Sequence, residues 1–398
     1  MKAPKGWRIR TLEEVAAIQT GLSKSASRTG DFVRLPYLRV ANVQDGHFNL
    51  SEIKEIDVPK EAVARFSVVV GDLLLTEGGD FDKLGRGAIW NGAIPNCVHQ
   101  NHIFVVRANE HVLERRFLAM QTQSAHGRAY FQSCSKQSTN LASINSSQLK
   151  QFPVLLPPLP EQQKIADILG TWDEAREKLD ALIAAKARRK QALMQQLLTG
   201  HRRLPGFSNK WKRRPFSEFL TESRVPVAQN DANHRLTVCL HLQGIQARDF
   251  RMSESTDATV YYERKAGQFI YGKQNIHKGA LGIIPSHLDS FHSTQDVPAF
   301  DYKGECNPRW FFFLVSRPSY YSQLETQMRG TGSKRLAPDL FLELEAPTPS
   351  IDEQRAIAAV LDTADAELRL LRQHRAAFDL QKWGLMQQLL TGRFRVSP

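Results

Sequence analysis

Two stretches of 42 residues decide the fold, because each is a diverged copy of the other. Residues 159–200 read LPEQQKIADILGTWDEAREKLDALIAAKARRKQALMQQLLTG, and residues 351–392 read IDEQRAIAAVLDTADAELRLLRQHRAAFDLQKWGLMQQLLTG. They align without a gap, 19 of the 42 positions are identical, and both end in LMQQLLTG. A second internal similarity lies upstream, where GWRIRTLEE at 6–14 resembles KWKRRPFSE at 210–218. The chain is therefore predicted to be a tandem duplication of a non-helical block followed by a helix.

Both repeats are predicted to be long helices. Their apolar residues recur mostly at steps of three and four, which is the period of one helical face. Each helix would extend over about 38 residues, or ~57 Å, which is longer than a typical globular helix and indicates a coiled coil. Burying the two stripes against each other places the helices antiparallel. The residues predicted to form the core of this helix pair are Ile165, Leu169, Trp172, Leu179, Ile183, Leu193, Ile357, Leu361, Leu371, Phe378 and Leu385.

Some helix positions leave two interpretations open. Glu367, His374 and Gln381 share one row of the second repeat, and they either face water or form a surface for another protein. The run Lys186–Lys190 is basic, which is more typical of a solvated helix face than of a DNA contact.

The block before each repeat carries strand and turn signals followed by a helical segment. In the first block strands are expected at Tyr37–Val43, Ser67–Val70, Asp72–Leu75, Ala88–Trp90 and Ile103–Val106, with a helix at Glu114–Arg128. In the second block strands are expected at Leu236–Leu242, Thr259–Tyr262, Gln268–Tyr271 and Leu281–Ile284, with a helix around Trp310–Met328.

This order predicts an α+β chain in which two α/β domains are joined by two long antiparallel helices with pseudo-two-fold symmetry. The predicted divisions are 1–157 and 201–348 for the domains, and 158–200 and 349–398 for the helices. Pseudo-symmetry also predicts that Arg393–Pro398 lies near Lys5–Arg10, which would make the chain nearly circular.

The composition favours a polyanionic partner. The 398 residues include 53 Lys and Arg against 41 Asp and Glu, so the formal charge is +12 and the pI is near 9.6. A basic surface that binds nothing is the alternative. No apolar run approaches the ~18–20 residues of a membrane span, and the N-terminus has no apolar signal core, so a cytoplasmic protein binding nucleic acid is expected. The four cysteines lie far apart without a CxxC, which indicates reduced thiols.

The chain resembles the specificity subunit of type I restriction-modification systems. The resemblance is carried by Glu161-Gln162 and Glu353-Gln354, by both LMQQLLTG ends, by Leu204–Phe207 leading to Trp211, and by Gly71–Asp80 with Gly85–Gly87 just after it. It implies two target-recognition domains, each reading one half of a bipartite double-stranded DNA site. It also implies that the helices recruit two methylation subunits and, through them, restriction subunits. S-adenosylmethionine, ATP and Mg would then be bound by those partners, and this chain would bind no cofactor.

Candidate DNA-contacting residues fall in corresponding places of the two blocks. Arg and Lys read guanine or hold phosphates, Asn and Gln read adenine, and glycines allow close approach. In the first block the candidates are Gly78, Gly79, Lys83, Arg86, Gln100, Asn101, Lys136, Gln137 and Asn140. In the second block they are Lys273, Gln274, Asn275, His277, Lys278, Lys334 and Arg335. For any single residue an ordinary solvated turn remains the alternative.

No catalytic or metal-binding residue is predicted. The only Pro-Pro, Pro157-Pro158, lacks the flanking residues of an adenine methyltransferase motif, and Gly267–Lys273 is followed by Gln274 where a phosphate-binding loop needs Ser or Thr. Two alternatives stay open: a metal-dependent nuclease using Glu263 and Lys265, with Asp257 upstream, and a DNA-binding scaffold without sequence preference.

Overall fold

The computed structural model describes residues 3–23, 31–81, 84–137, 142–227, 231–248 and 260–397. The chain divides into two compact units. Unit one comprises Met1–Leu179 and Arg375–Pro398, and unit two comprises Asp180–His374. Each unit therefore holds one globular block and one end of each long helix. We call residues 3–157 block one and residues 201–348 block two; the domain boundaries expected from the sequence stay predictions.

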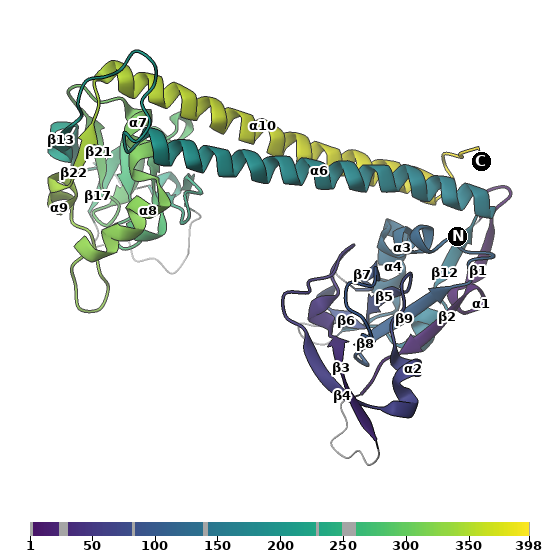
Figure 1. The fold of residues 1–398 in the computed structure, drawn as a ribbon. Helices are drawn as coiled ribbons and strands as arrows, with labels where there is room; N and C mark the ends of the chain where they lie inside the picture. The colour runs from purple at the N-terminus through teal and green to yellow at the C-terminus, as the bar shows by residue number, and fades with distance from the viewer. Residues whose placement is uncertain are drawn as a thin grey trace. The chain divides into compact units, whose positions relative to one another are not determined.

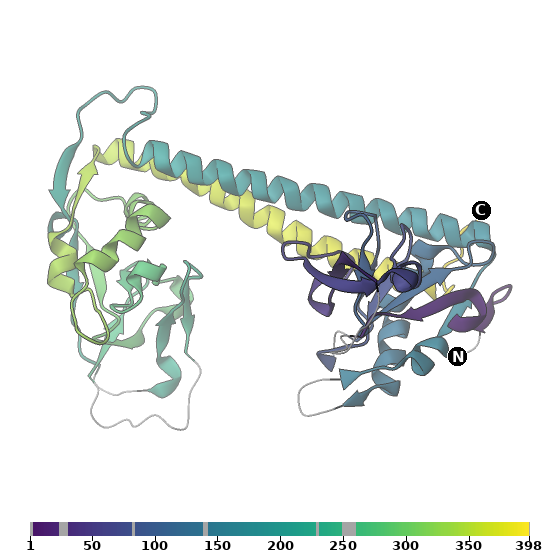
Figure 2. The same cartoon turned by 60° about the horizontal axis from the view of Figure 1, so that its bottom comes forward.

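Both repeats are helices, α6 (Leu159–Leu197) and α10 (Ile351–Leu390). In unit one the ring centroids of Trp172 and Phe378 lie 4.5 Å apart, and in unit two Lys190 of α6 binds Asp365 of α10. Within unit two, Lys186 also binds Glu367, so the partner number on α10 falls as the α6 number rises, and the two helices are antiparallel there, as Figure 2 also shows. Within the described residues, no helix is both long and apolar enough to span a bilayer.

The helix ends are buried more deeply than the middle of the pair. In unit one Ile165 and Leu169 of α6 join Met386, Leu389 and Leu390 of α10 in one core with block one. In unit two Ile357 and Leu361 of α10 join Met194, Leu197 and Leu198 of α6 in one core with block two. The other residues expected in the helix-pair core are half-buried: Trp172, Leu179, Ile183, Leu193, Leu371, Phe378 and Leu385. Between the ends, Leu370 and Leu380 are 63% and 74% exposed.

Ion pairs join the central parts of the helices. Lys186 binds Glu367 and Lys190 binds Asp365 in unit two, and Lys382 binds Asp173 in unit one. The basic run of α6 is therefore split, because its two lysines face α10 while Arg188 and Arg189 are exposed. Glu367, His374 and Gln381 are all exposed, and Glu367 in addition pairs with Lys186 of the sister helix.

Block one is built on a four-stranded antiparallel sheet in the order β2-β9-β5-β7. Its strands and helices can be followed in Figure 1. The elements of block one are β1 (Arg8–Thr11), α1 (Leu12–Val15), β2 (Ala16–Thr20), β3 (Phe32–Leu38), η1 (Val40–Asn42), β4 (Lys54–Pro59), η2 (Lys60–Ala62), α2 (Val63–Phe66), β5 (Leu73–Thr76), β6 (Gly78–Gly79), β7 (Gly87–Ile89), β8 (Val98–His99), β9 (Ile103–Ala108), α3 (Arg115–Gln123), α4 (Ala125–Cys134), β10 (Lys136–Gln137), β11 (Ala142–Ser143), α5 (Ser146–Lys150) and β12 (Pro153–Leu156).

Block two repeats this plan, with a sheet in the order β14-β21-β18-β19. Its elements are β13 (Lys212–Pro215), η4 (Phe216–Glu218), β14 (Leu220–Ser223), η5 (Ala232–His234), β15 (Leu236–Val238), β16 (Ile245–Ala247), β17 (Tyr261–Arg264), β18 (Phe269–Tyr271), η6 (Ile276–Lys278), β19 (Leu281–Ile283), η7 (Ser286–Leu288), β20 (Phe291–Thr294), β21 (Ala299–Tyr302), α7 (Pro308–Val315), α8 (Pro318–Tyr321), η8 (Ser322–Gln327), α9 (Pro338–Glu343) and β22 (Glu345–Thr348). In each block the first strand pairs with the last, β1 with β12 and β13 with β22, so the chain enters and leaves side by side.

Several local predictions were wrong. Ser67–Val70 is a turn before β5 that leaves Val69 and Val70 exposed, so its apolar residues do not form a strand. The single helix expected at Glu114–Arg128 is two helices, because Ser124 ends α3 and also caps α4. The helix expected around Trp310–Met328 begins earlier, at Pro308, and is broken before Pro318, whose ring cannot continue a helix.

A buried glutamine ties each block to the start of its own long helix. The side-chain oxygen of Gln162 accepts a hydrogen bond from the amide of Glu114. Its side-chain nitrogen donates hydrogen bonds to the carbonyls of Val112 and Pro157. Gln354 repeats all three bonds with Asn307, Glu305 and Pro349. The Glu-Gln pair that marks both repeats thus fixes the loops around the helix start.

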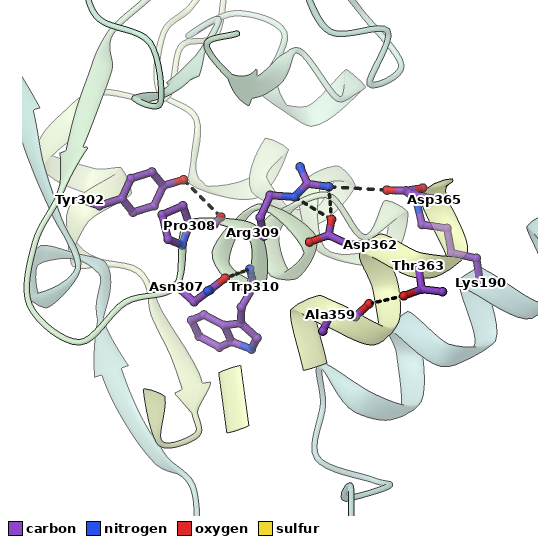
Figure 3. A network of polar contacts seen from close by, with 10 residues as sticks. All are labelled: Lys190, Tyr302, Asn307, Pro308, Arg309, Trp310, Ala359, Asp362, Thr363 and Asp365. Carbon is purple, nitrogen blue, oxygen red and sulfur yellow. Dashed lines mark hydrogen bonds and ion pairs between the residues drawn. The ribbon is translucent and has the colours of Figure 1, made fainter. Parts of the chain in front are cut away.

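An arginine adds a second tie in each unit. Arg309 of α7 contacts Asp362 of α10 at 2.5 Å and Asp365 at 3.8 Å, and Lys190 of α6 meets the same Asp365 (Figure 3). Arg116 of α3 makes the corresponding contact in unit one, 2.9 Å from Asp167 of α6.

Candidate nucleic-acid interface

In block one the predicted loops converge on Glu77, which directly follows β5. Its amide donates to the carbonyl of His102 at 3.0 Å, and its carbonyl accepts the amide of Ile144 at 2.9 Å. Its carboxylate Oε2 lies 2.6 Å from Nδ1 of His102. One residue therefore connects the loop after β5, the Gln100–His102 turn and the segment after β11.

A small sheet brings two of the predicted loops together. β6 pairs with β11, and β11 pairs with β10, so Gly78 and Gly79 lie in one three-stranded sheet with Lys136 and Gln137. A Cβ on Gly78 would come within 3.1 Å of the carbonyl of Ala142, so this strand approaches its neighbour closely. Lys136 is exposed, and Asn101 and Gln100 are half-buried. Lys83, Asn140 and the side chain of Gln137 lie outside the described residues.

Arg86 lines a separate hollow of about 420 Å³ in block one. Its carbonyl accepts the amide of Thr76, so it lies one strand away from Glu77. Arg128 and Asp45 line the same hollow and pair at 3.1 Å. The hollow is polar and charged, in keeping with a surface for nucleic acid rather than for an apolar ligand.

In block two the predicted loops converge on Lys273, which follows β18. Its amide donates to the carbonyl of Asp296 at 2.9 Å, and its carbonyl accepts the amide of Leu336 at 3.0 Å. Arg335 reaches Asp296 at 3.4 Å, so the 329–335 loop joins the 272–278 loop. Lys273, Gln274, Asn275 and Asp296 line a pocket of about 160 Å³.

The remaining candidates of block two lie around this loop. His277 and Lys278 belong to η6, where Lys278 is exposed and His277 is half-buried. Gln274 is exposed and Asn275 is half-buried, with its carbonyl accepting the amides of Lys278 and Ala280. Lys334 is exposed and lies 3.9 Å from Glu325.

A strained turn lies against this loop. The strand expected at Leu236–Leu242 ends at Val238, so the second half of that prediction was wrong. His241 and Leu242, between β15 and β16, both have positive φ values, 55° and 57°. Such a conformation is costly for a large side chain and persists where the surroundings enforce it. Here the amides of His241 and Leu242 donate to the carbonyls of Lys278 and Gly279. His241 is exposed beside the predicted loop and is therefore a further candidate contact.

The strands behind the second interface are held by a buried arginine. Arg264 donates to the carbonyls of Ser223 and Val297 and to the hydroxyl of Ser293. Burial lowers the pKa of its guanidinium to about 10. Because Val297 also lines the Lys273 pocket, Arg264 supports the pocket wall from behind.

The residues of the nuclease alternative do not form a metal site in the described part of the chain. Glu263 lies in β17 and Lys265 follows it, while Asp257 is outside the described residues. Among the described residues no group of three or more His, Cys, Asp or Glu side chains could hold a metal ion.

Comparisons with known proteins agree with the resemblance inferred from the sequence. Residues 4–185 match the family described as type I restriction modification DNA specificity domain. The MjaX specificity subunit of a type I restriction enzyme from Methanocaldococcus jannaschii is 22% identical, covering 99% of this chain and 95% of that protein. The MjaVIII specificity subunit from the same organism is 21% identical over 91% of this chain and 86% of its own length.

Solved structures share the fold. The HsdS subunit from Thermoanaerobacter tengcongensis has a TM-score of 0.51 at 16% identity, with 99% of each chain covered. The S subunit from M. genitalium has a TM-score of 0.55 at 14% identity, with 98% of each chain covered. The class is thus an α+β protein with two blocks and two long helices. Within that class, residues 4–185 match the type I restriction modification DNA specificity domain, and the whole chain is similar to type I specificity subunits. The comparisons agree with the prediction of a specificity subunit, and they give no support to the nuclease alternative.

Proposed function

We propose that this chain is the DNA specificity subunit of a type I restriction-modification complex, in which each block reads one half of a bipartite target. The observation that carries the proposal is the repetition of one polar junction. Glu77 comes directly after strand β5 of one sheet, and Lys273 comes two residues after the equivalent strand β18 of the other. Each residue makes one backbone hydrogen bond through its amide and one through its carbonyl, to corresponding segments of the two blocks. Polar loops converge there, on a chain of charge +12.

The partners follow from the same duplication. Each unit presents one helix start and one helix end beside its block, so the complex offers two equivalent places for a methylation subunit. Restriction subunits join through these. S-adenosylmethionine, ATP and Mg belong to the partners, and the complex acts in the cytoplasm on double-stranded DNA.

The experiment is a selection from random duplex DNA with the chain purified together with its methylation subunits. Two short conserved sequences separated by an unconserved spacer are expected. Enrichment of no sequence, with tight binding of all duplexes, would support the scaffold without sequence preference instead.

A further inference from the structure

We infer that Glu77 and Lys273 occupy the same specificity-determining position of the two blocks and read bases of opposite hydrogen-bonding character. The inference rests on the proposed function and names what one residue in each block recognises. Glu77 was not among the individual candidates in the first block, although it directly precedes the candidate Gly78.

The equivalence follows from matched backbone bonds. Before the junction, Thr76 donates its amide to the carbonyl of Arg86, and Gly272 donates to that of Ala280. At the junction itself, the amide and carbonyl bonds of Glu77 with His102 and Ile144 are those of Lys273 with Asp296 and Leu336. The next strand provides a third match. A glycine with positive φ precedes β7 in block one (Gly85, 67°) and β19 in block two (Gly279, 74°).

Both backbone groups of each residue are used, so the Cα position is fixed from two sides. A side chain that starts from a fixed backbone can discriminate between bases, because its hydrogen-bonding atoms sample few positions. Both side chains are only half-buried, which leaves part of each accessible from outside.

The two side chains have opposite chemistry. A carboxylate only accepts hydrogen bonds and a lysine ammonium only donates them. The residue next to each side chain differs as well. The amide of Glu77 donates a hydrogen bond to the carbonyl of His102, and the amide of Lys273 donates one to the carbonyl of Asp296. Nδ1 of His102 holds the Glu77 carboxylate at 2.6 Å, so His102 acts as a positioning residue for it.

A carboxylate near the DNA backbone is repelled by phosphates and is tolerated where a base supplies a donor. In the major groove the amino group of cytosine is such a donor, and O6 and N7 of guanine are the matching acceptors for lysine. Glu77 is therefore assigned to a cytosine in the first half-site. Lys273 is assigned to a guanine at the equivalent place of the second half-site.

The test is the random-duplex selection applied to charge-reversal variants of the full chain with its methylation subunits. Glu77→Lys should move one base pair of the first half-site from cytosine toward guanine, and Lys273→Glu should move one base pair of the second half-site from guanine toward cytosine. The change in relative enrichment should be about tenfold or more, with the other half-site unchanged.

Matched controls lie at the far ends of the neighbouring strands. Glu110→Lys follows the end of β9 and Lys303→Glu follows the end of β21, and both should leave the selected sequences unchanged. If Glu77→Lys proves unstable by thermal melting, Glu77→Gln keeps the size of the side chain and should shift the preference toward adenine.

The possible results distinguish a failure of the proposed function from a failure of the base assignments of Glu77 and Lys273. If the unaltered complex selects no bipartite sequence, the proposed function fails. If it selects one, and the reversals leave it unchanged, weaken all sequences equally or alter both half-sites, then Glu77 and Lys273 do not read bases and this inference is overturned.

Discussion

Arg395 binds Glu161 through two hydrogen bonds, 2.6 Å from Nε to Oε1 and 2.7 Å from Nη2 to Oε2. Arg203 binds Glu353 with the same atoms at 2.6 and 2.7 Å. Each arginine lies three residues beyond the LMQQLLTG end of one helix, and each glutamate lies at the buried start of the other. In each unit, an arginine just beyond the end of one long helix therefore binds a glutamate at the start of the other long helix. The duplication has produced this contact twice.

Loss of either arginine should lower the melting temperature of its own unit. In Arg395→Ala the carboxylate of Glu161 would stay buried without its partner, which is strongly unfavourable. The second change Glu161→Gln should restore part of the lost stability, because a neutral amide is less costly to bury. Differential scanning calorimetry of the single and double variants checks this, with Arg203→Ala and Glu353→Gln as the equivalent series in unit two. A double variant no more stable than Arg395→Ala would contradict the explanation.

Gln354→Ala should destabilise unit two by about 2–3 kcal/mol, because three hydrogen bonds worth roughly 1 kcal/mol each would be lost around a buried side chain. Denaturant unfolding followed by tryptophan fluorescence measures the change. Arg309→Ala is the matched control, since Arg309 joins the same block to the same helix (Figure 3) but is 41% exposed. Its loss should cost less than about 1 kcal/mol. Equal costs for the two variants would argue against the buried amide as the principal tie.

A circular permutant should fold and bind DNA. The prediction that the chain ends lie together is confirmed, because Arg395 donates to the carbonyl of Lys5 at 2.6 Å and its guanidinium lies over the ring of Trp7. Joining Ser397 to Ala3 and opening the chain between Pro205 and Gly206 keeps Arg203 attached to α6. Circular dichroism and DNA selection measure the result. The same joined chain opened inside buried β5 is the control that should not fold.

The protein should lose stability as the pH falls below about 6.5, and His99 should account for part of the loss. Burial lowers the pKa of His99 from its ordinary value of 6.5, and its Nδ1 lies 3.0 Å from the carbonyl of Phe66. The unfolded chain then binds a proton that the folded chain resists, so the free energy of unfolding decreases on acidification.

Unfolding midpoints between pH 8 and pH 5 measure this effect. His99→Gln should flatten the curve below pH 6.5, whereas the exposed His47→Gln should leave its shape unchanged. Some pH dependence should remain in His99→Gln, because burial also lowers the pKa of His292. An unaltered curve in His99→Gln would assign the pH dependence to other groups.

The sequence by itself determined the duplication and both long helices, because helical periodicity is a local property that 42 residues express fully. It also indicated where the polar loops lie, since turn residues act within a few positions. It did not show how deeply each residue predicted for the helix-pair core is buried. Periodicity shows which face of α6 is apolar, but the block and the opposite helix end decide which part of that face is buried, so Ile165 is buried while Leu179 is only half-buried.

Only the tertiary structure decided how distant residues meet. Along the sequence Glu161 is only one residue near the start of a predicted helix, whereas the structure pairs it with Arg395, 234 residues away. It placed Gly78 and Lys136 in separate loops, which strand pairing through β11 joins in one sheet. Glu77 and Lys273 look unrelated along the chain because their side chains differ in charge. What they share is a pair of backbone hydrogen bonds, and these form only when segments far apart in sequence fold against each other.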